Sequence, residues 1–220
     1  MSLPDGGAVV LRSTLHHEGG VREVRSDGWL SLFLDEGFVA AIFDCDGTLV
    51  ESAGAHMKAM QAAAADQGFD MAPDWYRART GLDRRSLFQA FAATVPSAFD
   101  VERAVRTSIA RFGGFAQLVE PKADVLRFAT DLKGRGVPMA VATNAEHDVA
   151  QLCLASVGAA EVFDQLISVS DGVAPKPSPQ MFLLAAERLG VARNRALVFE
   201  DSPQGVAAAL DAGMSVVQIM

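Results

Sequence analysis

Asp44 and Asp46 are the residues of this sequence with the clearest capacity for chemistry. They follow an apolar run at 38–42, which predicts a buried strand. Side chains at positions i and i+2 of an extended chain point to the same side, so both carboxylates can serve one site. Two carboxylates this close repel each other, which raises one pKa unless a cation intervenes. The pair suits a carboxylate nucleophile, a neighbouring acid/base and a divalent metal.

Gly47 and Thr48 complete this first motif. Glycine lets the backbone turn sharply after the strand, and Thr48 offers a hydroxyl and an amide near that turn. We expect both residues to help bind an anion such as phosphate.

Anion-binding groups also follow two later predicted strands. Thr143 and Asn144 end the strand at 137–142 and precede a helix, where donors make an anion site. Lys176 lies in a proline-stiffened loop after the strand at 165–169, in a chain where lysine is scarce. These three side chains are the predicted phosphate ligands at those strand ends.

Two adjacent acids, Glu200 and Asp201, end the predicted strand at 196–199. Acids in this position are costly unless they bind a cation or hydrogen-bond donors. With Asp44 and Asp46 they offer oxygen ligands for a hard cation, and Mg²⁺ with phosphate is the natural pairing. Each of these polar groups, taken alone, could simply be a turn-forming or solvent-exposed residue after a strand. That explanation does not account for polar groups at four strand ends of one sheet.

Short apolar strands alternating with amphipathic helices must position these residues. This alternation predicts an α/β fold, a parallel sheet sandwiched by helices with ligands at the C-terminal ends of the strands. Besides the strands already named, we predict a last strand at 215–219 and helices at 121–133, 146–156, 179–189 and 204–212.

A helical stretch interrupts the alternation just after the first strand and predicts an inserted cap domain. Its helices are expected near 56–68, 73–80, 84–94 and 101–112. The predicted domains are an N-terminal extension at 1–37, a core at 38–54 and 120–220, and a helical cap at 55–119.

The N-terminal extension has a weaker pattern. Our interpretation is a peripheral extension packed on the core, with no catalytic role and with His16 and His17 at the surface. It contains possible strands at 8–11 and 21–24 and an apolar patch at 29–34.

The composition limits the partners of the protein. A formal net charge of -8 over 220 residues disfavours non-specific binding to nucleic acid or anionic membranes. No apolar run approaches the ~20 residues that span a bilayer, and no basic segment precedes a signal-like run. Two cysteines fit a reducing compartment. We expect a cytoplasmic protein, a monomer or weak dimer, acting on a small phosphorylated metabolite.

The motifs together resemble the haloacid dehalogenase-like superfamily, whose hallmark is Asp-x-Asp-Gly-Thr. The resemblance covers residues 38–220 and extends to the β-phosphoglucomutase and sugar-phosphatase branch, through the segments at 198–205 and 212–214. It implies a Rossmann-like sheet with an α-helical cap. Its four motif blocks occur in order: 44–48, 143–144, 176–177 and 200–201.

The resemblance also implies residue roles. Asp44 is the nucleophile that forms an aspartyl-phosphate, and Asp46 is the acid and then the base. Mg²⁺ is held by Asp44, the backbone carbonyl of Asp46 and Asp201, with Glu200 close or bound through water. The transferred phosphoryl group is held by Thr143, Asn144 and Lys176, and the 176–177 peptide bond is expected to be cis.

Cys45, between the two aspartates, stands where a bulky apolar residue is common. A cysteine phosphatase needs an arginine at the end of its anion loop, and Glu51 stands at that position. We therefore predict that Cys45 is a small core residue.

Two alternatives to a phosphatase remain open. Dehalogenases lack the equivalent of Asp46, but a β-phosphoglucomutase-like phosphomutase keeps it and uses a cap arginine to grip a second phosphate. Arg84 could fill that role, although Lys58 is poorly placed as the accompanying lysine. A catalytically silent phospho-ligand-binding module is the third reading. His56 could relay protons or contact substrate, or it could simply pack at the base of the cap.

Overall fold

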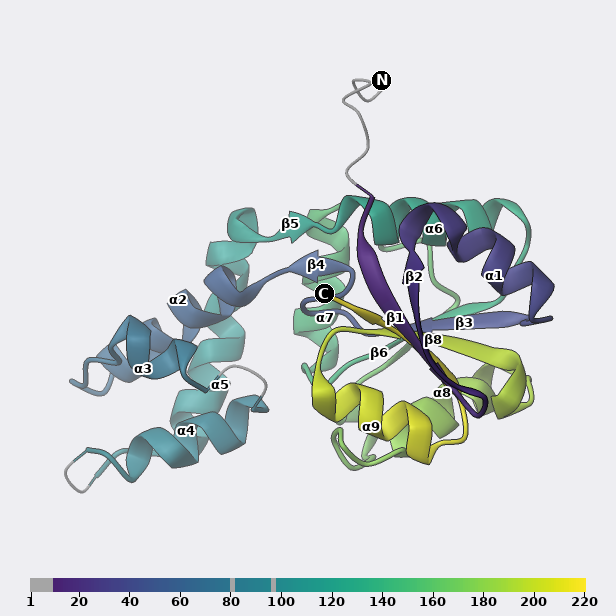
Figure 1. Ribbon diagram of the computed structural model, residues 1–220. Helices are drawn as coiled ribbons and strands as arrows, with labels where there is room; N and C mark the ends of the chain where they lie inside the picture. The colour runs from purple at the N-terminus through teal and green to yellow at the C-terminus, as the bar shows by residue number, and fades with distance from the viewer. Residues whose placement is uncertain (1–9, 80–81, 96–97) are drawn as a thin grey trace.

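The centre of the fold is a seven-stranded, mostly parallel sheet (Figure 1). The computed structural model describes residues 10–79, 82–95 and 98–220. The strands are β1 Arg12–His17, β2 Gly20–Arg25, β3 Ala40–Phe43, β6 Met139–Ala142, β7 Gln165–Ile167, β8 Ala196–Glu200 and β9 Ser215–Ile219. Their order is β2-β1-β9-β8-β3-β6-β7, and the five from β9 to β7 are parallel. The predicted α/β class is confirmed.

The strand β3 is apolar throughout because both of its faces are covered. Ala41 and Phe43 belong to the core on one face of the sheet, and Ala40 and Ile42 belong to the core on the other face. All four residues are buried. An unbroken apolar run is what a parallel strand between two helical layers requires.

Helices cover both faces of the sheet (Figure 1). The side of Phe43 carries α1 Trp29–Asp35, α6 Ala123–Gly134 and α7 His147–Ser156. The side of Ile42 carries α8 Gln180–Leu189 and α9 Pro203–Asp211. No helix of the described residues is both long and apolar enough to cross a membrane.

The cap helices lie beside the sheet, on the left in Figure 1. They are α2 Ala53–Ala65, α3 Pro73–Arg77, α4 Arg84–Ala92 and α5 Val101–Phe112, close to the predicted ranges apart from Thr80, which lies outside the described residues. A separate apolar cluster that includes Met71, Phe88 and Phe91 joins them. The side chains of Asp83 and Asp100 cap the N-termini of α4 and α5. The exact division into domains stays a prediction.

Two short strands, β4 Val50–Glu51 and β5 Glu120–Pro121, connect the cap to the core and pair antiparallel. The prediction that Pro121 opens a helix is wrong, because Pro121 pairs with Val50 and α6 begins two residues later. The backbone amide of Lys122 then donates to Leu49 O at 2.9 Å and extends this pairing.

The N-terminal segment packs on the core, as predicted, and in addition extends the central sheet at its edge. The strand β1 pairs antiparallel with both β9 and β2 and covers the edge that β9 would otherwise expose. Trp29 is fully buried, and its Nε1 donates to Ser13 Oγ at 2.9 Å. The prediction of a strand at 8–11 is wrong for its described part, because β1 begins at Arg12, and residues 8 and 9 lie outside the described residues. His16 is half-buried, and its Nε2 lies 3.1 Å from Gln218 Oε1.

Candidate active site

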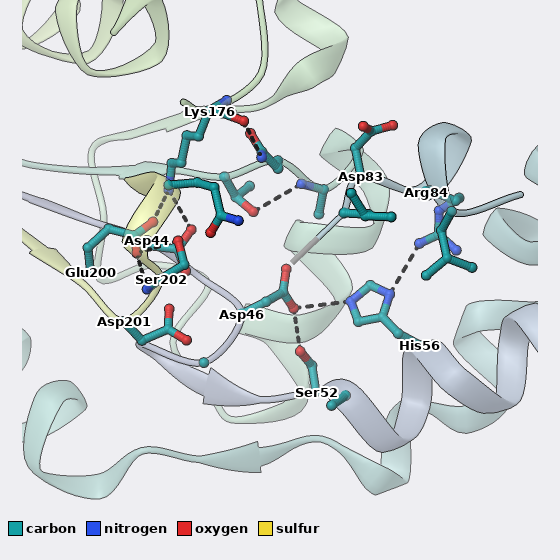
Figure 2. Close-up of a pocket in the computed structure, with 18 of the residues that line it drawn as sticks. Asp44, Asp46, Ser52, His56, Asp83, Arg84, Lys176, Glu200, Asp201 and Ser202 are labelled. Carbon is teal, nitrogen blue, oxygen red and sulfur yellow. Dashed lines mark hydrogen bonds and ion pairs between the residues drawn. The ribbon is translucent and has the colours of Figure 1, made fainter. Parts of the chain in front are cut away.

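A cavity of about 490 Å³ lies between the C-terminal ends of the parallel strands and the cap. Every predicted site residue except Thr48 lines it. The sheet brings the ends of β3, β6 and β8 side by side, so motifs far apart in sequence meet here. Figure 2 shows the labelled residues of the cavity and the contacts among them.

Lys176 lies between two buried carboxylates that line the cavity (Figure 2). Its Nζ donates to Asp44 Oδ1 at 2.6 Å and to Glu200 Oε1 at 2.8 Å. Burial alone would lower the pKa of Lys176, but the charges of Asp44 and Glu200 raise it above its ordinary value. Burial raises the pKa of Asp44, and Lys176 opposes that rise. The cavity thus holds an ammonium that is charged at neutral pH beside the predicted nucleophile.

Asp46 accepts hydrogen bonds from two residues where the cap begins. Ser52 Oγ donates to Asp46 Oδ1, and His56 Nε2 lies 3.1 Å from the same oxygen. Burial would raise the pKa of Asp46, but His56 and Ser52 lower it to about 2. Burial would lower the pKa of His56, but Asp46 raises it to about 9. At neutral pH the two side chains are therefore a charged pair.

Asp201 faces the turn at Gly47 and Thr48 that follows Asp44 and Asp46. Thr48 is buried, and its hydroxyl donates to Asp201 Oδ1 at 3.2 Å. The Thr48 side chain thus has a carboxylate partner, and a contact of Thr48 with phosphate stays a prediction. Gly47 has φ of +95°, and a Cβ there would overlap the Asp201 carboxylate. Burial and the charge of Glu200 raise the pKa of Asp201 to about 6.

The carboxylates fit a hard divalent cation. Oxygen atoms of Asp44, Glu200 and Asp201 all lie within 4.8 Å of one another. Glu200 Oε2 already accepts from the backbone amide and the hydroxyl of Ser202, at 2.6 and 2.9 Å. Asp44 and Asp201 are the better candidates for direct ligands, because Glu200 is already held by Lys176 and Ser202. Clustered carboxylate oxygens are the ligands that Mg²⁺ prefers.

Asn144 fastens the loop that carries Lys176. Its Oδ1 accepts from the backbone amide of Lys176 at 2.8 Å, and its Nδ2 donates to the carbonyl of the same residue at 3.3 Å. Thr143 is buried, and its Oγ1 accepts from the amide of Ala145 at 3.1 Å. These contacts organise the backbone around the cavity, and phosphate binding by the two side chains stays a prediction. The Lys176–Pro177 bond is cis, as expected.

Arg84 joins the cap to the core. Its Nε donates to Glu146 Oε2 at 2.9 Å, its Nη1 donates to Ser108 Oγ at 3.1 Å, and its Nη2 lies 3.3 Å from His56 Nδ1. The last contact is a hydrogen bond only when Nδ1 carries no proton, because the guanidinium is a donor without an acceptor. Arg84 itself is buried.

Cys45 is fully buried in the core beneath the sheet ends, which confirms its predicted structural position. Cys153 on α7 is also buried, and both thiols are free. Their hydrogen bond and burial raise the pKa of Cys45 well above its ordinary value. A thiol held in this protonated form is a poor nucleophile.

Among the polar cavity residues that were not predicted as site residues, Ser52, Glu146 and Ser202 contact predicted ones. Glu146 and Ser202 each stand one or two positions beyond a predicted motif, and this position was the available signal. Ser52 comes just before the first cap helix. Ser52, Glu146 and Ser202 contact Asp46, Arg84 and Glu200, respectively. These contacts depend on the three-dimensional arrangement.

Comparisons with known proteins agree with this geometry. A family model described as haloacid dehalogenase-like hydrolase matches residues 38–213. Fructose-1-phosphate phosphatase YqaB of Escherichia coli (strain K12) is 32% identical over 196 residues, which cover 84% of this chain and 97% of YqaB. Crystal structures of CbbY from Rhodobacter sphaeroides, one with phosphate and one a mutant with xylulose-(1,5)bisphosphate, are 26% identical. Their TM-scores are 0.74 and 0.73, over 80% of this chain and 84% of theirs. The chain belongs to the haloacid dehalogenase-like hydrolases.

Proposed function

We propose that the protein is a Mg²⁺-dependent phosphatase that hydrolyses a small sugar phosphate through an aspartyl-phosphate intermediate. The observation that carries this proposal is the convergence of Asp44, Asp201 and Lys176 at one end of the cavity. The relatives support the substrate class, since YqaB is named for fructose 1-phosphate and CbbY was crystallised with a sugar bisphosphate.

Asp44 is the proposed nucleophile. One of its carboxylate oxygens forms a bond to phosphorus while the bond from phosphorus to the leaving oxygen breaks. Lys176 lies 2.6 Å from Asp44 Oδ1 and stabilises both the ionised carboxylate and the negative charge of the phosphoryl group. Asp44, Asp201 and the backbone carbonyl of Asp46 would hold Mg²⁺. When bound, this ion would neutralise charge on the carboxylates and the phosphoryl oxygens.

Asp46 is the proposed acid and base. Among the described residues its side-chain contacts all involve Oδ1, which leaves Oδ2 for the leaving oxygen and later for water. His56 orients the carboxylate through its 3.1 Å contact with Oδ1. Protonated on Oδ2, Asp46 donates that proton to the leaving oxygen, and the carboxylate so formed takes a proton back from the water that hydrolyses the aspartyl-phosphate.

Phosphate release from 4-nitrophenyl phosphate tests this mechanism. We expect activity with Mg²⁺, loss of activity with a chelator, and a fall in kcat of about a thousandfold or more for Asp44→Asn. The exposed Asp35→Asn removes the same charge from α1 and should keep full activity. Activity without a divalent metal, or an active Asp44→Asn protein, would contradict the proposal.

The alternative functions have less support. A phosphomutase of this family would use Arg84 for a second phosphate, but Glu146, Ser108 and His56 already surround that guanidinium. A silent binding module would be expected to lack one of the reactive aspartates, and all of them are present. We also propose a cytoplasmic location, because both cysteines are free and buried, as in a reducing compartment.

A further inference from the structure

The cap side of the cavity differs in charge from the end where Asp44, Asp201 and Lys176 are proposed to bind phosphate. By "cap side" we mean the part of the cavity lined by Tyr76, Asp83, Arg84, Leu87 and Glu146. Within the described chain, Arg84 is the one lysine or arginine there, because the other such residue lining the cavity, Lys176, lies between Asp44 and Glu200.

The charge of Arg84 is already neutralised. Its Nε pairs with Glu146 at 2.9 Å, and the side chains of Arg84 and Glu146 are only 4% and 20% exposed. The guanidinium also donates to Ser108, a fully buried cap residue. A ligand that took Arg84 away from Glu146 would leave a carboxylate unpaired in a mostly buried position, which is strongly unfavourable.

The other groups of the cap side are acidic or neutral. Asp83 accepts from the amide and hydroxyl of Ser86, and no cation pairs with it within residues 10–79, 82–95 and 98–220. Burial and Asp46 raise the pKa of Tyr76 to about 12, so its hydroxyl is a neutral hydrogen-bonding group at neutral pH. Leu87 adds an apolar wall.

From this charge distribution we infer that the protein selects sugar monophosphates and rejects substrates that carry a second phosphate at the far end. This inference rests on the proposed phosphatase function and names its substrate class. Glu146 and Asp83 are the proposed specificity-determining residues, because they would lie close to a distal phosphate and repel it. A neutral hydroxylated end would instead meet Tyr76, Asp83 and the apolar wall.

A matched pair of compounds, fructose 1-phosphate and fructose 1,6-bisphosphate, tests this inference. Each is measured with Mg²⁺ as a substrate and as a competitor of 4-nitrophenyl phosphate hydrolysis. We expect the wild-type kcat/KM to favour the monophosphate by about tenfold or more. In Glu146→Gln the ratio should move toward the bisphosphate by about tenfold, because Arg84 gains a free positive charge.

Asp148→Asn is the matched control. Asp148 is exposed in the first turn of α7, two residues from Glu146, and does not line the cavity. This variant has the same change in charge and should keep the wild-type ratio. Asp83→Asn is a second test variant that retains a good helix cap, so it covers the case in which Glu146→Gln does not fold. Its ratio should move in the same direction by about threefold.

Binding without turnover separates the two proposals. Calorimetric titration of the Asp44→Asn protein with each compound in Mg²⁺ should show the monophosphate binding about tenfold more tightly. Wild-type protein without any phosphatase activity would contradict the proposed function, while this binding ratio would still test selectivity. Equal binding of the two compounds, or equal shifts in Glu146→Gln and Asp148→Asn, would overturn the inference.

Discussion

Lys176 Nζ donates to Asp44 Oδ1 across 2.6 Å, and this contact joins two side chains that are 2% and 9% exposed. The same ammonium lies 2.8 Å from Glu200. A single cation thus compensates two buried carboxylates, one of which is the proposed nucleophile. The arrangement ties the stability of the site to its reactivity.

Replacement of Lys176 should therefore lower both the stability of the protein and its activity. Lys176→Met leaves two buried carboxylates without their cation, and we expect a loss of about 3–5 kcal/mol in the free energy of unfolding at neutral pH. We also expect kcat to fall by about a hundredfold or more. Urea unfolding and phosphate release measure the two effects. The exposed pair of Lys133 and Asp164 supplies a control, since Lys133→Met should cost at most about 1 kcal/mol.

The charged pair of Asp46 and His56 predicts a pH-dependent contribution to stability. The pKa of His56 is raised from 6.5 to about 9, so its contribution is complete below pH 6.5 and is lost as the pH rises through 9. The pKa of Asp46 is lowered from 3.8 to about 2, so its contribution is complete above pH 3.8 and is lost toward pH 2.

His56→Gln should lower the free energy of unfolding by about 2–3 kcal/mol at a pH near 6 and by much less near pH 10. Urea unfolding in the presence of a chelator at the two pH values measures this difference. The exposed His147→Gln is the control, with an expected change within about 0.5 kcal/mol at both values. An equal loss for His56→Gln at both values would mean that its role is packing.

Gly47 should tolerate no side chain. Gly47→Ala places a Cβ against the Asp201 carboxylate and adds the strain of φ +95°. We expect a fall in kcat/KM of about tenfold or more and a weaker stabilisation by Mg²⁺ in thermal unfolding. Gly37→Ala is the matched control, because Gly37 has φ of +72° with nothing within 4 Å of a Cβ. It should cost about 1–2 kcal/mol of stability and leave activity unchanged.

Trp29 should be essential to the fold although it precedes the family-matched region. Its ring centroid lies 5.7 Å from that of Phe128 and 5.2 Å from that of Phe199. Trp29→Ala should lower the free energy of unfolding by about 3–5 kcal/mol. Leu34→Ala, at an exposed position of the same helix, should cost less than about 1 kcal/mol. Urea unfolding of both variants decides whether the N-terminal segment is an integral part of the core.

The sequence predicted those parts of the site that are local. Asp44 and Asp46 share one strand tip, and Glu200 and Asp201 share another, so a motif and the rule for parallel sheets were sufficient. The pairing of β1 with β9 joins segments at opposite ends of the chain, and no local pattern specifies it. The ion pair of Arg84 with Glu146 likewise depends on how the cap sits on the core.

Both connections between the cap and the core run through the pairing of β4 with β5, where Val50 lies opposite Pro121 and Glu51 lies opposite Glu120. A cap attached in this way has one two-stranded hinge, so we expect it to rotate relative to the core as a single rigid body. Val50 also forms a β-bridge with Asp46. Bending of the hinge would therefore move the backbone of Asp46, the proposed acid and base. Opening of the cap for product release would then displace Asp46 from its catalytic position in the same motion.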